Sequence, residues 1–336
     1  MSADPVQLKP VTASKGKAIP NTHPRNEGMK LDLSVIEDIR MNLSAIEQRT
    51  ATLSGRRSVK KDWQAAWLLK SITCMDLTTL SGDDTPDRVK RLCAKAANPI
   101  RADLLDAMGF TKPLHTGAVC VYHAMVPTAV KALEGTDIPV AAVSTGFPHG
   151  LSPMSTKLQE IRESVAAGAK EIDIVITRQY VLTQNWDALY DEMKQYRDAC
   201  GDARIKAILA VGELATMRNI AKASMVCMMA GADFIKTSTG KEATNANLNN
   251  TLAMIRMIRQ YQTMTGFKVG YKPAGGISKA KDALMYQALM KDELGREWLE
   301  PDLFRFGVSS LLGDIERQIE HFVTGHYSAS NRHPIG

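Results

Sequence analysis

The sequence lacks the features that mark membrane-spanning and secreted proteins. No apolar run reaches the roughly 18 residues that a transmembrane helix needs. The first 30 residues carry four prolines and two glycines but no apolar stretch of the kind found in signal peptides. We therefore expect no membrane association, and we interpret residues 1–30 as a flexible arm.

Cysteine is sparse and its spacing excludes the common metal sites. The chain has five cysteines, and none forms a Cys-x-x-Cys pair or a Cys/His cluster with metal-ligand spacing. An odd number of cysteines in a chain of 336 residues favours a reduced, cytoplasmic protein over a disulfide-bonded one. We predict no bound metal.

Blocks of like charge are also missing. The net charge is +6 and the isoelectric point about 9.0, but the basic residues are scattered along the chain. A basic enzyme that handles phosphate explains such a charge as well as nucleic-acid binding does, and without basic blocks we expect no nucleic-acid partner. No Gly-x-Gly-x-x-Gly motif follows an early strand, which argues against a doubly wound dinucleotide-binding sheet.

What the chain does contain is a repeated alternation of strand-like and helical segments. Residues 31–53 carry apolar residues at helical spacing, and residues 60–72 form a second helical stretch, so we predict a helical extension over 31–70. Eight strand candidates follow at 72–77, 117–122, 140–144, 171–176, 205–211, 234–238, 268–272 and 303–307. Helical runs separate most of them, which predicts parallel βαβ units and a (β/α)₈ TIM barrel over 71–327, with a tail at 328–336.

Four ionisable residues interrupt the apolar strands of this predicted barrel. Asp173 lies between Ile172 and Ile174, and strand alternation turns it toward the barrel axis if the isoleucines face the helices. The same alternation places the side chains of Lys206 and Lys236 on the inward face of their strands, and Lys272 lies on the next strand. Any one buried lysine is more often part of a structural ion pair, but several buried cations with so few acids would be costly.

Close lysines have a chemical use. Two ammonium groups about 6 Å apart repel by roughly 3 kcal/mol at an effective dielectric constant near 20, which corresponds to about two pKa units. Burial lowers a lysine pKa further. One of the pair Lys236 and Lys272 can therefore be neutral near pH 7–8 and attack a carbonyl carbon, while Asp173 moves protons through water.

Glycine- and serine-rich segments follow the last two predicted strands. In (β/α)₈ barrels these loops commonly bind phosphate through backbone N–H groups. We predict a phosphate site from residues of these loops, Gly275, Gly276, Ser278, Lys279, Gly307, Ser309 and Ser310, together with Gly240 and Lys241 after the sixth strand. A helix start at Gly240 is an equally good explanation of Lys241.

Four segments, "MDLTTL", "KEIDIV", "GADFIKTSTGK" and "GYKPAGGI", resemble the deoxyribose-phosphate aldolase family in order and spacing. The resemblance covers about 260 residues and is strongest to the longer, eukaryotic-like branch. It implies a metal-independent, class I aldolase that cleaves 2-deoxy-D-ribose 5-phosphate reversibly to D-glyceraldehyde 3-phosphate and acetaldehyde without a cofactor. By the matched motifs, Lys236 would form the Schiff base, Lys272 would lower its pKa, Asp173 would relay protons and Lys206 would complete the network.

The sequence departs from this family at two places. Many relatives carry arginine where Ser278 stands, followed here by Lys279, and some use a tyrosine at the end of the chain, whereas the last tyrosine here is Tyr327. Another lysine-dependent barrel lyase, of the transaldolase or fructose-bisphosphate aldolase kind, stays an alternative, as does an inactive barrel with a binding role. As partners we expect only a phosphosugar substrate and a homodimer.

Overall fold

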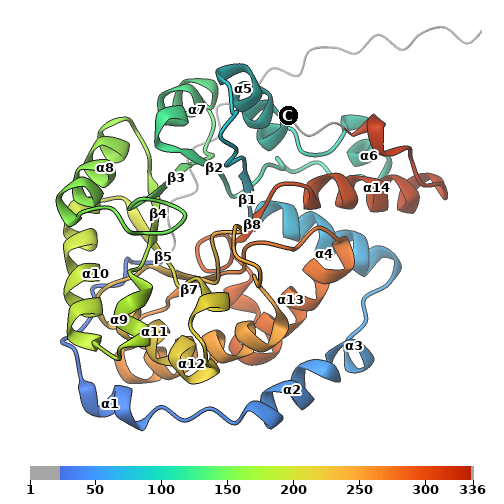
Figure 1. Ribbon diagram of the computed structural model, residues 1–336. Helices are drawn as coiled ribbons and strands as arrows, with labels where there is room; N and C mark the ends of the chain where they lie inside the picture. Colours follow the sequence, from blue (N-terminus) through green and yellow to red (C-terminus); the bar gives the residue numbers. More distant parts are fainter. Residues whose placement is uncertain (1–22, 334–336) are drawn as a thin grey trace, which may run out of the picture.

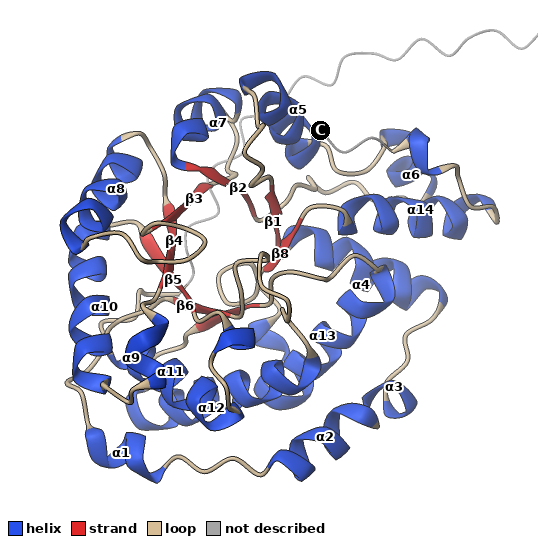
Figure 2. Ribbon diagram, in the orientation of Figure 1, coloured by secondary structure: helices blue, strands red, loops and turns tan. Residues whose placement is uncertain are grey.

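The structure is a computed structural model that describes residues 23–333, and its centre is a ring of parallel strands enclosed by helices (Figures 1 and 2). The strands within this range are β1 Met75–Thr78, β2 Ala118–Tyr122, β3 Val140–Ser144, β4 Glu171–Val175, β5 Arg204–Ile208, β6 Phe234–Lys236, β7 Gly270–Lys272 and β8 Phe306–Val308. They form one sheet in the order β7-β6-β5-β4-β3-β2-β1-β8. Parallel bridges from Tyr271 to Phe304 and from Ala274 to Gly307 join its two edges. The predicted (β/α)₈ barrel is confirmed.

Helices cover the outside of the ring and bury the apolar faces of the strands (Figure 2). Those of the barrel are α4 Lys61–Thr73, α5 Pro86–Ala97, α6 Ala102–Ala107, α7 Val126–Ala132, α8 Met154–Ala166, α9 Arg178–Leu182, α10 Trp186–Cys200, α11 Met217–Met229, α12 Leu248–Thr265, α13 Ala280–Leu294 and α14 Leu311–Thr324. Within the described part of the chain, no helix is both long and apolar enough to cross a membrane.

The first predicted strand began too early. Ile72 belongs to α4, which ends at Thr73, and β1 begins at Met75. The segment from Ile72 to Leu77, predicted as one strand, therefore contains the end of a buried helix and then a buried strand. Strand β8 likewise begins at Phe306, not at Leu303. A short apolar run alone does not distinguish a helix end from a strand, so such boundaries are the weakest part of a sequence-based prediction.

The N-terminal helical extension consists of short pieces and not of one long helix. The helices α1 Leu33–Asp38, α2 Leu43–Ala51 and α3 Leu53–Arg56 run along the outside of α11, α12 and α13 (Figure 1). Asp32 and Asn42 each cap a new helix with a side-chain oxygen, and the backbone is extended at Ile39 between them. Because a separate helix begins at each of these caps, residues 31–53 do not form the single amphipathic helix that their apolar spacing predicted.

Residues 23–30 pack against the barrel, so this part of the predicted flexible arm is corrected; residues 1–22 lie outside the described range. The buried Asn26 side chain donates hydrogen bonds to the carbonyls of Met228 (2.8 Å) and Ala232 (2.9 Å). Its amide oxygen accepts a hydrogen bond from the Tyr261 hydroxyl at 2.9 Å. The preceding Arg25 forms an ion pair with Asp233 at 3.0 Å. The segment is thereby fixed to the start of β6 and to α12.

Replacing this anchor is expected to destabilise the fold. Asn26→Ala removes the hydrogen bonds to the carbonyls of Met228, which keeps the Gly231 N–H as a donor, and of Ala232, and the free energy of unfolding should fall by about 2 kcal/mol. Urea denaturation measures the change, with Asn98→Ala, at an exposed position after α5, as the matched control. A loss at Asn26 no larger than that at Asn98 would show that the segment is not an anchor.

Candidate active site

A cluster of seven ionisable side chains fills one half of the barrel interior. Its members come from five strands and from the residue before β8, and all are buried: Asp76, Glu171, Asp173, Lys206, Lys236, Lys272 and Arg305. We call them the interior cluster. The opposite half of the interior is apolar and includes Cys120 and Val143.

Strand register brings the cluster together. Asp173 on β4 lies opposite Lys206 on β5, and Lys236 on β6 lies opposite Lys272 on β7. In parallel strands, residues that are paired in this way project to the same side of the sheet. The inward orientation predicted for these residues is confirmed by their mutual contacts.

Asp173 contacts all three lysines. Its Oδ2 accepts hydrogen bonds from Lys236 Nζ (2.8 Å) and Lys272 Nζ (2.7 Å), and its Oδ1 accepts one from Lys206 Nζ (3.0 Å). The two lysines of the predicted catalytic pair therefore share one carboxylate oxygen. A proton can pass between them through Asp173 with little movement of heavy atoms.

Sequence reasoning did not single out the other three members of the cluster. Asp76 accepts hydrogen bonds from Lys206 (2.9 Å) and from Lys272. Arg305 donates to Asp76 (2.6 Å) and Glu171 (2.8 Å), and Lys206 also reaches Glu171 (2.5 Å). Asp76 stands between Met75 and Leu77, which is the same signal of an acid inside an apolar strand that identified Asp173.

The charges of the cluster do not balance when every member is ionised. Four cations face three carboxylates. An uncompensated charge in a buried site is costly, so the environment favours the loss of one proton from one lysine.

Of the three lysines, Lys236 has a pKa below the usual lysine value, whereas the pKa values of Lys206 and Lys272 lie above it. Burial lowers its pKa, Asp173 acts in the opposite direction, and the Lys272 ammonium lowers it further. Burial alone would also lower the pKa of Lys206 and Lys272, but contacts with both Asp173 and Asp76 raise them above the usual lysine value. Burial is thus the main cause at Lys236, and repulsion from Lys272 is a smaller one than the sequence argument assumed.

A pocket of about 280 Å³ opens above the cluster, at the carboxyl ends of the strands. Lys236 is the one member of the interior cluster among its lining residues, which are Thr78, Thr79, Leu80, Ser81, Lys236, Thr239, Gly240, Lys241, Ala274, Gly275, Gly276, Gly307, Val308 and Ser309. The amine with the lowered pKa is therefore also the amine that a molecule in the pocket can reach. Asp173, Lys206 and Lys272 lie beneath it.

Most of the predicted phosphate residues line this same pocket. Gly240, Lys241, Gly275, Gly276, Gly307 and Ser309 are among its walls, whereas Ser278, Lys279 and Ser310 are not. Lys279 precedes α13, and the first amide of that helix, on Ala280, donates to Asp314 at 2.7 Å. The N-terminus of α13 is thus already partnered by a carboxylate.

The structure adds detail on the surroundings of Gly307 and Lys241. A Cβ atom at Gly307 would lie 2.8 Å from the Ala274 Cβ and 3.1 Å from the Lys272 Cε. A side chain at this position would therefore collide with Ala274 and crowd the Lys272 side chain. No helix begins at Gly240: the next helix, α12, starts at Leu248 with Asn247 as its cap. Lys241 is instead an exposed cation at the rim of the pocket.

The described part of the C-terminal segment packs away from the strands. Tyr327 stacks on His321 of α14 with ring centroids 4.1 Å apart, and it is exposed. His333 is buried and lies 2.9 Å from Glu320 of the same helix.

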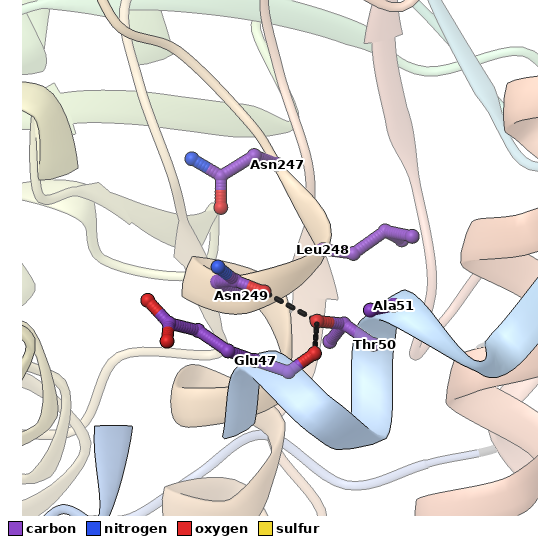
Figure 3. Close-up of a pocket in the computed structure, with 6 residues that line it drawn as sticks. All are labelled: Glu47, Thr50, Ala51, Asn247, Leu248 and Asn249. Atoms are coloured by element: carbon purple, nitrogen blue, oxygen red, sulfur yellow. Dashed lines mark hydrogen bonds between the residues drawn. The ribbon is translucent and has the colours of Figure 1, made fainter. Parts of the chain in front are cut away.

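A second, larger hollow of about 410 Å³ lies between α2 and the start of α12 (Figure 3). It is lined by Glu47, Thr50, Ala51, Asn247, Leu248 and Asn249, and Figure 3 shows Thr50 bridging to Asn249 across it. It offers no amine and shares no residue with the pocket above Lys236. We therefore place the candidate active site at the smaller pocket.

Among residues 23–333, no group of three or more histidine, cysteine, aspartate and glutamate side chains has the arrangement of a metal site. The three acids of the interior cluster are separated by the lysine and arginine groups that contact them.

Comparison with known proteins shows which family the chain resembles. The sequence model of the DeoC/LacD aldolase family matches residues 70–314. The chain is 58% identical over 311 residues to the deoxyribose-phosphate aldolase of Mus musculus and 56% identical over 313 residues to that of Homo sapiens, in both cases over 92% of this chain and 98% of the relative. The solved structure of a deoxyribose phosphate aldolase from Aeropyrum pernix superposes with a TM-score of 0.56 at 20% identity, covering 85% of this chain and all of that chain. The last likeness bears on the fold alone.

Proposed function

Because the chain belongs to the DeoC/LacD family of aldolases, we propose that the pocket above Lys236 is the site at which it breaks a carbon–carbon bond through an imine on that lysine. The reaction is the reversible cleavage of 2-deoxy-D-ribose 5-phosphate to D-glyceraldehyde 3-phosphate and acetaldehyde. The observation that carries the assignment of Lys236 is that it alone combines a lowered pKa with a place in the pocket wall.

The first stage forms the covalent intermediate. The neutral Lys236 amine attacks the C1 aldehyde of the open-chain sugar, and loss of water gives an iminium ion. The positively charged nitrogen then attracts the electrons of the bond to be broken. Asp173, in contact with both Lys236 and Lys272, receives and returns the protons that these steps release and require.

The second stage breaks the bond between C2 and C3. Removal of the proton from the C3 hydroxyl forms the aldehyde of glyceraldehyde 3-phosphate, and the electrons of the C2–C3 bond move toward the iminium nitrogen to give an enamine. Protonation of C2 and hydrolysis of the iminium release acetaldehyde and restore the Lys236 amine. The proton passes through water to Asp173 and Lys272, which lie directly below the reacting nitrogen.

The phosphate group at C5 lies, in this proposal, at the far wall of the pocket. Backbone N–H groups of the segments at 239–241 and 275–276, the Ser309 hydroxyl and the Lys241 ammonium are the candidate donors. Because these groups are distant from the bond that breaks, the energy of binding them positions the substrate and is partly expressed in turnover. A homodimer of this chain stays a prediction.

Exhaustive chelation is expected to leave turnover unchanged, because the iminium nitrogen withdraws electrons without a Lewis acid. Release of glyceraldehyde 3-phosphate from deoxyribose 5-phosphate is followed in a coupled assay before and after dialysis against a chelator. A zinc-dependent aldolase treated in the same way is the positive control. Activity that disappears on chelation and returns with zinc would place the enzyme outside the imine mechanism.

A further inference from the structure

A turn in the wall of the active-site pocket binds a carboxylate side chain of the same turn. The Glu242 carboxylate accepts hydrogen bonds from the backbone N–H of Thr239, at 3.1 Å from each oxygen, and from that of Gly240, at 3.2 Å. The Thr239 hydroxyl in turn accepts a hydrogen bond from the Lys241 N–H at 3.1 Å. Thr239, Gly240 and Lys241 all line the pocket that contains Lys236.

The arrangement has the pattern of a helix cap, but it caps no helix. A threonine followed three residues later by a glutamate that reaches back to the threonine N–H is a capping box. Residues 239–247 are not helical, and α12 begins only at Leu248, where Asn247 accepts a hydrogen bond from the Asn250 N–H at 2.9 Å. Within the described residues, no lysine or arginine forms an ion pair with Glu242. The partners of its carboxylate are therefore the two amides of the turn.

Backbone amides in such turns are the groups that bind phosphate oxygens in many enzymes. Gly240 has a positive φ of 87°, and a Cβ placed on it would lie 3.9 Å from the Gly275 Cα, so the turn faces the glycine segment after β7 closely. A phosphate group held between these two segments would meet the same amides that Glu242 occupies. A phosphate and a carboxylate cannot share two N–H donors, and their negative charges repel each other.

We propose that Glu242 is an internal competitor for the phosphate subsite and sets the affinity of the enzyme for phosphorylated sugars: its carboxylate occupies the Thr239 and Gly240 amides in the free enzyme, and the substrate phosphate displaces it. This inference rests on the proposed function, because it takes the pocket to be the one that receives the sugar phosphate. A phosphate with a charge near −2 competes for the amides better than a carboxylate with a charge of −1. A sugar without phosphate leaves Glu242 in place.

Binding of inorganic phosphate, measured by titration calorimetry, tests the proposal without any turnover. Glu242→Gln removes the charge but keeps a weaker acceptor, and Glu242→Ala frees both amides. Both variants should bind phosphate about tenfold more tightly than the wild type, since one charge-assisted hydrogen bond made available to the ligand corresponds to about that factor. Glu134→Gln, at an exposed position near the start of β3, makes the same change in net charge away from the pocket and should bind phosphate as the wild type does.

Steady-state kinetics supply the second readout. In both Glu242 variants, KM for deoxyribose 5-phosphate should fall about as far as the phosphate dissociation constant, while kcat/KM for unphosphorylated 2-deoxyribose stays at the wild-type value. Phosphate affinity that is unchanged or weaker in both variants would overturn the proposal and assign Glu242 to the stability of the turn. A gain equal to that of Glu134→Gln would also overturn it, as an effect of net charge alone.

Failure of the proposed function would look different. If Lys236 did not form the imine, the enzyme would show no acetaldehyde-dependent labelling of that lysine by borohydride, whatever the phosphate affinities. Phosphate binding that responds to Glu242 while Lys236 stays unlabelled would support the competitor role and reject the imine. Labelling of Lys236 together with a phosphate affinity that does not change in the Glu242 variants would support the imine and reject the competitor role.

Discussion

Lys236→Ala is expected to abolish aldol cleavage, with a loss of roughly 10³-fold or more in kcat. No other lysine of the interior cluster lines the pocket, and Lys241, the second lysine of its wall, is exposed at the rim and away from the Asp173 carboxylate, so we expect no second amine to form the imine in the same place. The substitution also removes one of the four buried cations, which leaves three cations facing three carboxylates. The variant should therefore fold, and thermal unfolding should confirm this before activity is compared.

Borohydride reduction in the presence of acetaldehyde measures the covalent step directly. The wild type should retain one label on the peptide that contains Lys236, and the alanine variant should retain none. Lys236→Arg keeps a long basic side chain but fixes a positive charge at this position; it should be equally inactive, because guanidinium stays protonated and is not a nucleophile. Label recovered on a Lys272 peptide in the wild type would reverse the assignment of the two lysines.

Lys272→Met is expected to reduce activity at pH 7 and to move the acidic limb of the pH–rate profile to higher pH. The neutral form of Lys236 is the nucleophile, so the rate rises with pH through the pKa of this residue. Burial and the Lys272 charge hold that pKa below its usual value, while Asp173 raises it. Without the Lys272 charge, the effect of Asp173 on the pKa of Lys236 is less compensated, so this pKa rises. A rise of about one unit lowers the fraction of neutral Lys236 amine at pH 7 about tenfold.

The profile of kcat/KM between pH 6 and pH 10 separates this effect from others. Partial recovery of Lys272→Met at high pH is the expected result, and a constant loss at every pH would show that Lys272 acts through proton transfer or substrate contact alone and does not lower the pKa of Lys236. Lys206→Met is an informative comparison because Lys206 contacts Asp76, Glu171 and Asp173 but not Lys236. Its loss should lower thermal stability more than it displaces the acidic limb.

The positions of the strands and the inward lysines were predictable because each depends on local alternation. Asp173 between two isoleucines can only face the interior of a barrel whose helices cover the other side. The partners of these residues were not predictable in the same way, since contacts across the barrel depend on how far each strand is displaced along its neighbours. Arg305 lies between Phe304 and Phe306 and carries the same signal, but nothing local shows that it pairs with Asp76 on β1.

The balance between causes of the Lys236 pKa shift also required the structure. A count of lysines predicted repulsion as the main cause, and the direction of the shift agrees with that prediction. Asp76 and Glu171 add two buried carboxylates, which stabilise the ammonium forms of Lys206 and Lys272 and leave burial as the leading cause at Lys236. Similarly, a helix start at Gly240 was one of two explanations of Lys241, and only the backbone after Gly240 shows a turn.

The attachment of Asn26 to residues more than 200 positions later in the chain has a consequence for synthesis on the ribosome. The hydrogen bond between Asn26 and Tyr261 spans 235 residues of sequence. At about 5–20 residues per second, roughly 12–47 s pass between translation of the first partner and of the last. Until Met228, Ala232 and Asp233 have been translated, the segment around Asn26 lacks all of these partners, and its contact with Tyr261 forms only after α12 is complete. A fusion partner attached before this segment would therefore be joined to a stretch of chain whose docking is delayed until late in translation.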